Sequence, residues 1–398
     1  MCHQVRWTHR ALGLIALLLA AGCAHQPSSL ANHKDISADA VVIVIDDPRG
    51  ALRRRGNGPG YNAPLTYADD PILKRYANAI AADYDLAIIE QWPLRNLGVH
   101  CFVVERPQPE VLASVTLDDR VKWLQDFNEF TVQSAASPSA SESNAQDCVL
   151  CQFASEFDSR GVNVTIAVVD TAADTDHPDL KRSRLMTRNF AGNRGNPEEE
   201  KHGTAIVGLI AAVADTKTGI NGTAPGATVH LLRGCWQDTK GVGRCNTLTL
   251  ALALDAAIDV QPDILNLSLT GRRDRILDEL MARILASGTL VFAAYDEQRA
   301  ADARFPARHP GVIYAYGIER SSMHRVASDV FLAPRHALSL TPMAGYDLVS
   351  GHSVATPQLA GMAARLMALD DSASRARIIT DLSAWLDDYY AVARRSTP

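Results

Sequence analysis

The sequence predicts an α/β protein with a mostly parallel sheet covered by helices on both faces, preceded by a small α+β module. From about 155 to 370, short apolar runs alternate with helical patterns, which is typical of a parallel sheet. Between 40 and 132 the pattern changes to a β-α-β-β-α-β order, and a Ser/Ala-rich stretch separates the two regions. A length of 398 residues with 47% hydrophobic content is enough for two domains plus tails.

The first 22 residues read as a secretory signal. Basic residues precede an apolar run at 11–21, which is too short for an ordinary membrane-spanning helix. The run ends in small residues followed by Cys23, as in a bacterial lipobox, in which this thiol is lipidated; an ordinary signal with an incidental cysteine is the alternative. Residues 23–39 are polar and indicate a tether. We therefore expect an exported protein: an outer-membrane lipoprotein facing the periplasm, or one released to the periplasm or the extracellular space after processing.

The region 40–132 is expected to form a compact ferredoxin-like module. The β-branched run at 41–45 predicts its first strand, and the remaining elements follow in order: a helix at 72–83, strands at 86–91 and 99–105, a helix at 109–115 and a last strand at 121–132. The stretch 133–154 reads as a flexible linker, a natural domain boundary and an accessible cleavage site.

The region 155–370 is the main domain. Its strand candidates are 164–169, 229–232, 263–269, 290–294 and 312–316, and its helix candidates are 204–213, 248–258, 276–286 and 354–368. The tail at 371–398 predicts one or two amphipathic helices and a frayed end.

Export also bears on the cysteines, since exported proteins commonly form disulfides. Cys235 and Cys245 flank a short Gly-containing loop, which suits a local bridge. Cys148 and Cys151 have the spacing of a zinc CxxC, but the absence of a second CxxC makes disulfide chemistry the better interpretation. A bridge from Cys101 to one of these two cysteines would join the module to the main domain.

Three segments of the main domain carry reactive side chains. Asp170 closes an apolar strand, at the edge where α/β folds place their sites. His202 is followed by Gly-Thr at the start of a helix, and Ser353 lies in the run Gly-His-Ser-Val-Ala-Thr-Pro that opens another. Taken singly, the Asp and the Ser are more often caps, and the His is more often structural.

Together, in this order and spacing, the three segments resemble the motifs of the subtilisin-like serine protease family. Supporting matches lie between them: Asn-Gly-Thr-Ala-Pro-Gly at 221–226, Ile-Leu-Asn-Leu-Ser-Leu at 264–269, Phe-Pro-Ala at 305–307 and Gly-Tyr-Asp at 345–347. The resemblance spans about 160–368 and implies the family's three-layer sandwich and a serine endopeptidase activity.

The resemblance implies a role for each matching residue. Ser353 would be the nucleophile, His202 its general base and Asp170 the group that orients the imidazole. The backbone N–H of Ser353 would be one oxyanion donor. Substrate-binding residues would come from two further runs: Ser268, Leu269 and Thr270 on one side, and Ala293, Ala294 and Tyr295 on the other.

The chain departs from the family at the second oxyanion donor. The family has Asn where this chain has Asp296, and an ionised carboxylate cannot donate a hydrogen bond. Three interpretations follow: a slow or narrowly specific protease, a protease that uses another donor, or a catalytically impaired lipoprotein that acts as a binding or scaffold protein. The intact set of three reactive residues favours activity. His352, just before Ser353, is either a second titratable group near the site or simply exposed, and we expect the latter.

Several partners and cofactors follow from the resemblance or are disfavoured by the composition. The module at 40–132 resembles the family's propeptide, with an unrelated small domain as the alternative, so polypeptide substrates and the chain's own propeptide are the expected partners. Membrane contact is expected only through the lipid anchor. No cofactor is required; Asp179 matches a calcium-ligand position, but the stretch 215–218 does not support a site. A net charge of −6 with mixed signs gives no case for nucleic acid, and neither a phosphate loop nor an α/β-hydrolase elbow is found.

Overall fold

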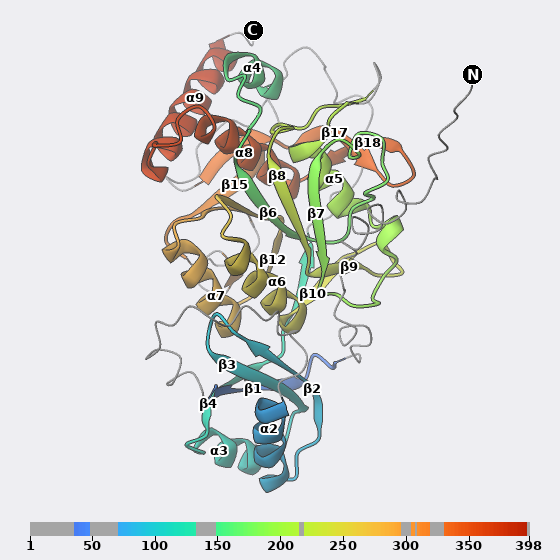
Figure 1. Ribbon diagram of the computed structural model, residues 1–398, viewed down its shortest axis with the longest axis vertical. Coiled ribbons are helices and arrows are strands. Elements are labelled where there is room, and N and C mark those ends of the chain that lie inside the picture. Colours follow the sequence, from blue (N-terminus) through green and yellow to red (C-terminus); the bar gives the residue numbers. More distant parts are fainter. Residues whose placement is uncertain are drawn as a thin grey trace, which may run out of the picture.

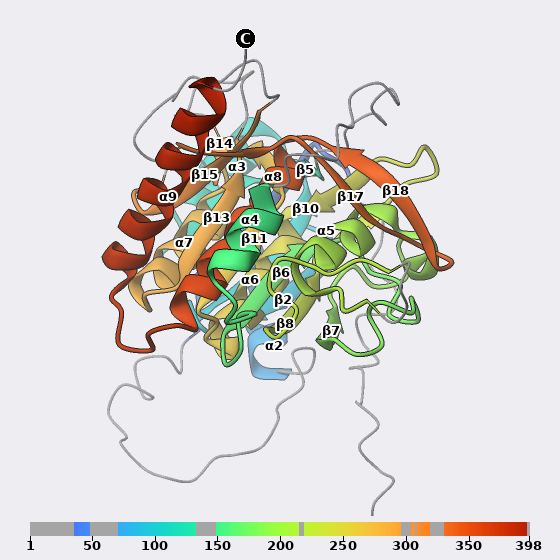
Figure 2. The same ribbon diagram turned by 90° about the horizontal axis from the view of Figure 1, so that it is seen from above.

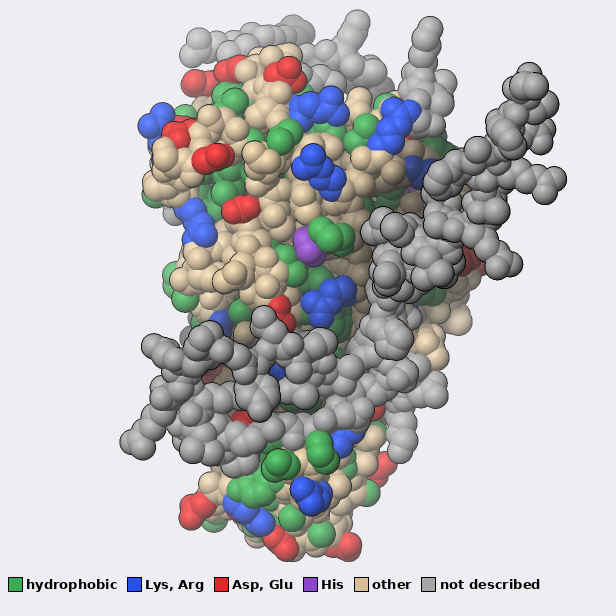
Figure 3. Space-filling model, in the orientation of Figure 1, with side chains coloured by type: hydrophobic (Ala, Val, Ile, Leu, Met, Phe, Trp, Pro, Cys, Tyr) green, Lys and Arg blue, Asp and Glu red, His purple; other side chains and the backbone are tan. Residues whose placement is uncertain are grey.

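The computed structural model describes residues 36–47, 71–132, 149–214, 219–295, 304–306, 309–318 and 330–395. Figure 1 shows two parts stacked along the long axis: a smaller N-terminal part at the bottom and a larger α/β part above it. Basic and acidic side chains are interspersed on the face seen in Figure 3. No helix among the described segments is long and apolar enough to cross a membrane.

The N-terminal part is a four-stranded antiparallel sheet in the order β2-β3-β1-β4. Its elements are β1 (Ala40–Asp46), α2 (Pro71–Asp83), β2 (Ile88–Leu94), β3 (Val99–Glu105), α3 (Pro109–Thr116) and β4 (Val121–Asp126). Alternate residues of β1 face opposite sides: Ile43 and Ile45 pack with the helices, whereas Val42 and Val44 join the core shared with the upper part. The element order is the one the sequence predicts.

The last predicted strand of this module, 121–132, is wrong as a single element. The chain leaves the four-stranded sheet after β4, and β5 (Glu129–Val132) joins a five-stranded sheet of the upper part in the order β14-β12-β5-β10-β9. Asn128 lies at the crossing, where its N–H donates to the Thr247 hydroxyl at 2.9 Å and its carbonyl accepts from the Thr247 N–H. The predicted linker is also too long, because α4 (Val149–Glu156) begins inside it.

The upper part is built on a seven-stranded, entirely parallel sheet in the order β16-β15-β13-β11-β6-β8-β7. In chain order these strands are β6 (Thr165–Asp170), β7 (Arg184–Asn189), β8 (Thr228–Arg233), β11 (Ile264–Leu267), β13 (Leu290–Ala294), β15 (Val312–Ile318) and β16 (Val330–Pro334). The strand predicted at 263–269 is interrupted at Ser268, after which β12 (Leu269–Arg272) turns into the five-stranded sheet.

Helices cover both faces of this sheet, which confirms the three-layer α/β prediction. One face packs against α6 (Thr247–Val260) and α7 (Arg275–Ala286), and the other packs against α5 (Lys201–Ala211), α8 (His352–Met367) and α9 (Arg375–Arg395). In Figure 1, α6 and α7 lie between the sheet and the N-terminal part, and Figure 2 shows α8, α9 and α4 on the opposite side.

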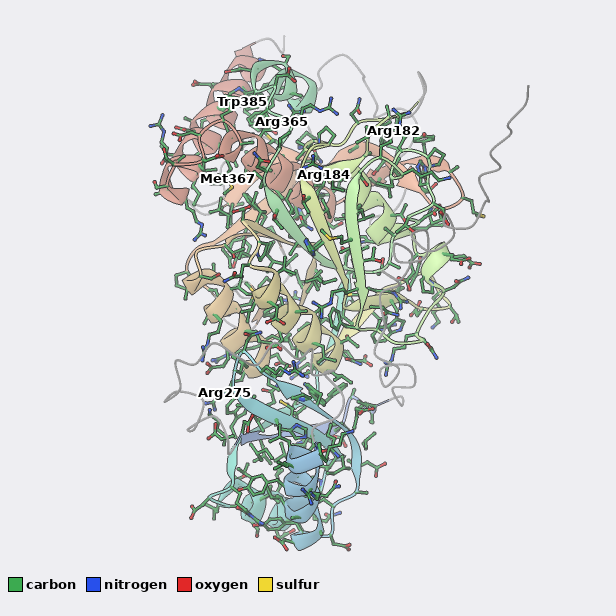
Figure 4. All side chains as sticks on the ribbon, viewed as in Figure 1. Arg182, Arg184, Arg275, Arg365, Met367 and Trp385 are labelled. Carbon is green, nitrogen blue, oxygen red and sulfur yellow. A yellow bond between two sulfur atoms is a disulfide. The ribbon has the colours of Figure 1, made fainter. Side chains whose placement is uncertain are left out.

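The two parts meet across α6 and α7. The guanidinium of Arg275, labelled in Figure 4 where the parts join, lies 4.3 Å from the Trp123 ring centroid. Beside it the buried carboxylate of Asp274 accepts from the Gln125 and Asn128 side-chain amides at 2.8 and 3.0 Å. Burial raises the pKa of Asp274, while these donors oppose the rise. The interface therefore combines apolar packing with a buried polar network.

Two hairpins that were not predicted from the sequence complete the upper part. β9 (Cys235–Gln237) pairs with β10 (Gly243–Asn246), and β17 (His336–Thr341) pairs with β18 (Gly345–Ser350). The two-residue strand β14 (Arg304–Phe305) forms the far edge of the five-stranded sheet.

Candidate active site

Asp170 and His202 are joined by a direct hydrogen bond. Asp170 is the last residue of β6 and fully buried, and its Oδ1 lies 2.7 Å from Nδ1 of His202, the second residue of α5. An ionised carboxylate only accepts, so Nδ1 carries the proton and Nε2 is left with its lone pair. Nε2 is buried and has no hydrogen-bond partner among the described residues. The carboxylate thus fixes the orientation of the imidazole through Nδ1.

The start of α5 lies directly against the loop that follows Asp170. A Cβ at Gly203 would lie 2.3 Å from the carbonyl oxygen of Thr171, so only glycine allows this approach. The Gly203 N–H donates to the Thr171 hydroxyl at 2.8 Å, and the Asp174 N–H donates to the Thr204 hydroxyl at 3.0 Å. These bonds fix the backbone of His202 relative to that of Asp170.

Glu200, the residue before α5, is a buried side chain that links the start of α5 to the loop after Asp170. Its side chain is buried, accepts from the Ala172 N–H at 2.5 Å and forms an ion pair of 2.5 Å with Arg233 at the end of β8. Arg233 donates in turn to the Asn189 side chain and to the carbonyls of Gly192 and Arg194. The pair therefore connects β6, β8 and the helix of His202. Sequence reasoning missed it, because Glu200 ends an acidic run that reads as solvated.

Ser353 is the second residue of α8, at the same edge of the sheet. Its carbonyl accepts from the Ser268 hydroxyl at 3.1 Å, and Ser268 directly follows β11, the neighbour of the strand that ends in Asp170. The Asn266 amide donates to the same Ser268 oxygen at 3.1 Å. All three reactive residues therefore gather where β6 and β11 end. The structure has no hydrogen bond between His202 Nε2 and the Ser353 hydroxyl.

His352 is buried, contrary to the expectation of an exposed ring. Its Nδ1 accepts from the Gly317 N–H at 2.9 Å, and its ring lies 4.7 Å from that of Tyr316. Tyr295, which follows the buried pair Ala293 and Ala294, has its ring centroid 5.4 Å from that of Tyr316 and 6.3 Å from that of His352. The three rings thus form a cluster that includes the residue directly before Ser353. Asp296 lies outside the described residues.

A segment of the N-terminal part pairs with β12, the strand that directly follows Ser268. β5 runs antiparallel to β12 on one side and to β10 on the other, so it forms the middle strand of three. Val132 pairs with Leu269, Thr131 with Thr270 and Phe130 with Gly271. Phe130 and Val132 are buried, while Glu129 and Thr131 are exposed. The two predicted substrate-binding residues of β12, Leu269 and Thr270, thus bind an extended segment of this same chain.

The cysteines are only partly as predicted. The structure contains the disulfide Cys235–Cys245, which joins β9 to β10. Cys101 is a free thiol buried in β3, so the bridge from Cys101 to Cys148 or Cys151, which the sequence left open, is not formed. Its pKa is raised by burial and by the carboxylates of Asp274 and Asp255. Cys23 and Cys148 lie outside the described residues.

Asp179, which stands at the position that matches a calcium ligand, is hydrogen-bonded through one carboxylate oxygen. Its Oδ2 accepts from the Ile220 N–H at 2.8 Å and from the Tyr346 hydroxyl at 3.0 Å. Across the described segments, no group of three or more His, Cys, Asp or Glu residues is arranged to hold a metal ion.

This site and fold define a hydrolase of the serine endopeptidase class. The chain belongs to the subtilase family, whose model matches residues 161–386. Among curated proteins it is 28% identical over 236 residues to the "Major intracellular serine protease" of Bacillus subtilis (strain 168), covering 55% of this chain and 73% of that protein. It is 29% identical over 232 residues to "Thermitase" of Thermoactinomyces vulgaris, covering 56% and 82% respectively. The match to "Subtilisin NAT" of Bacillus subtilis subsp. natto is 28% over 231 residues and spans 59% of that protein.

Proposed function

We propose that this protein hydrolyses peptide bonds through an acyl-enzyme with Ser353 as nucleophile, His202 as general base and Asp170 as the orienting carboxylate. The observation that supports it most strongly is the Nδ1–Oδ1 bond of 2.7 Å at the sheet edge where Ser353 also lies. It leaves His202 Nε2 as the only imidazole nitrogen able to take a proton.

The chemistry follows from these positions. The Ser353 oxygen attacks the substrate carbonyl while its proton moves to His202 Nε2, and the imidazolium is stabilised by Asp170. The proton then passes to the departing amine, and water repeats the sequence to release the acid. A backbone N–H at the start of α8 supports the oxyanion, helped by the helix dipole. Asp296 replaces the second donor, so the proposed enzyme is slow or narrowly specific unless that carboxyl is protonated.

The N-terminal part is proposed to be a propeptide that inhibits the enzyme until it is cut away. The pairing of β5 between β10 and β12 supports this role, because an extended substrate would need the same backbone groups. The described register of β5 on β12 ends at Val132 opposite Leu269, the residue directly after Ser268, whose hydroxyl donates to the Ser353 carbonyl. Cleavage just beyond β5 would free the main domain. With Cys23 lipidated, the same cut would release that domain from an outer membrane into the periplasm or the medium.

A fluorophosphonate probe tests the activity. It reacts only with a serine activated by a neighbouring base, so Ser353 is expected to be labelled and the label to disappear in His202→Ala. The Phe130→Asp variant is treated with the probe in parallel, because the substitution is expected to weaken the pairing of β5 with β12. Ser353 of this variant is expected to be labelled faster than Ser353 of the wild type. Circular dichroism verifies that each variant is folded. A folded Phe130→Asp chain whose Ser353 stays unlabelled would favour the impaired, binding-type protein instead.

A further inference from the structure

One row of side chains crosses all five strands of the sheet that holds β5. Phe305 pairs with Gly271, Gly271 with Phe130, Phe130 with Cys245, and Cys245 with Cys235. Residues directly opposite one another in a sheet project to the same face, with Cβ atoms about 4.5–5.5 Å apart. Phe130 therefore stands in this row between Phe305 and the disulfide.

The neighbours of Phe130 form a closely fitted pocket. A Cβ at Gly271 would lie 1.8 Å from a ring carbon of Phe130, so the aromatic ring uses the space that a side chain at Gly271 would fill. On one side the Phe305 ring meets it edge-on with centroids 6.0 Å apart. On the other side stand Cys245 and Cys235, both buried in the same core. Divalent sulfur makes favourable contacts with aromatic rings.

β10, the strand that carries Cys245, has two short partner strands in the sheet. β10 spans four residues and pairs on one side with β9, which spans three, and on the other side with β5 itself. When β5 leaves, β9 is its remaining partner in the sheet. A two-stranded hairpin of this size is marginal on its own. The disulfide between Cys235 and Cys245, which are 10 residues apart in the sequence, holds the two strands of this hairpin together.

We propose that the Cys235–Cys245 disulfide is a specificity-determining element, which holds β10 in place as one half of the peptide-binding cleft and forms the wall of the pocket for an aromatic side chain. This assignment rests on the proposed function, in which residues 129–132 take the place of a substrate. Without the bond, β10 frays, the backbone pairing of Arg244 with Thr131 weakens, and the pocket loses its preference for an aromatic ring.

Hydrogen exchange followed by mass spectrometry tests this without any need for turnover. The full chain carrying Ser353→Ala is compared with the same chain carrying Cys235→Ala and Cys245→Ala as well. Amides of 129–132 and 243–246 are expected to exchange at least about tenfold faster without the disulfide. Amides of the β17–β18 hairpin, in a separate sheet, serve as the internal control and are expected to stay unchanged. If the double cysteine variant does not fold, the folded Ser353→Ala chain after reduction by a phosphine gives the same comparison.

A second measurement separates specificity from general loosening. Peptides copying 128–135 carry either Phe or Ala at the position of Phe130, and their kcat/KM values are measured with Ser353 intact. Removal of the disulfide is expected to lower the Phe-to-Ala ratio about tenfold, through KM rather than kcat. Equal exchange rates in 129–132 and 243–246 with and without the disulfide would overturn the proposal. Absence of any cleavage, with exchange still faster, would count against the proposed activity and leave the structural role of the disulfide supported.

Discussion

Asp170→Asn is expected to lower kcat for peptide hydrolysis by about 10⁴, with little change in KM. Asn is the same size but neutral, so it cannot stabilise the imidazolium that forms when His202 takes the Ser353 proton. In the structure, Asp170 Oδ1 accepts both from His202 Nδ1 and from the Thr171 N–H, each at 2.7 Å. If the NH2 group of Asn took the Oδ1 position instead of the carbonyl oxygen, it would donate to Nδ1 and leave the wrong tautomer of His202 facing Ser353. Steady-state kinetics on a peptide substrate measures the effect.

Asp176→Asn is the matched control. It makes the same chemical change in the loop that follows β6, but Asp176 is exposed. Its kcat is expected to stay within about twofold of the wild type, as for most surface substitutions. A comparable loss of kcat in both variants would show that the loop, and not the carboxylate–imidazole bond, is being disturbed.

Glu200→Gln is expected to reduce the free energy of unfolding by about 3–5 kcal/mol, because it leaves the buried guanidinium of Arg233 without its counter-charge. It also weakens the acceptor for the Ala172 N–H, two residues after Asp170. Urea unfolding is measured in the Ser353→Ala background, so that proteolysis does not intervene. Replacing both members, as Glu200→Leu with Arg233→Met, should cost less than the sum of the single changes because no isolated charge remains buried.

The exposed pair Arg377–Asp381 on α9 provides the comparison. Its nitrogen and oxygen lie 2.7 Å apart, but both side chains are open to water, so Arg377→Gln should change stability by at most about 0.5 kcal/mol. If Glu200→Gln and Arg377→Gln lowered the free energy of unfolding equally, burial would not increase the contribution of the Glu200–Arg233 pair to stability.

The parallel sheet, its helices and the three reactive residues were predictable because local signals coincide with them. An apolar strand ending in Asp170, small residues after His202 and a helix start at Ser353 are each visible within ten residues of sequence. Their meeting at one edge follows from the rule that parallel strands end together. The periodicity of the sequence was thus enough to predict these strands and helices and the sheet edge at which they meet.

What the sequence did not reveal depends on distant partners. The alternation that places Phe130 and Val132 inward is visible, yet it does not say that β5 pairs with β10 and β12 rather than continuing β4. Glu200 looks solvated until Arg233, 33 residues away, is placed beside it. The sequence predicts an exposed ring for His352 of α8, because the N–H that donates to its Nδ1 belongs to Gly317 of β15, 35 residues away. Each of these is a property of tertiary contacts, which periodicity does not encode.

Mass spectrometry of the purified protein, wild type beside Ser353→Ala, tests most directly whether the hydroxyl at the edge of this sheet cuts peptide bonds. The wild-type chain is expected to be cut within residues 130–155, that is, within or after β5, and the Ser353→Ala chain is expected to remain whole. An uncut wild-type chain, or the same cut in both proteins, would contradict the assignment of Ser353 as the nucleophile acting on its own N-terminal part.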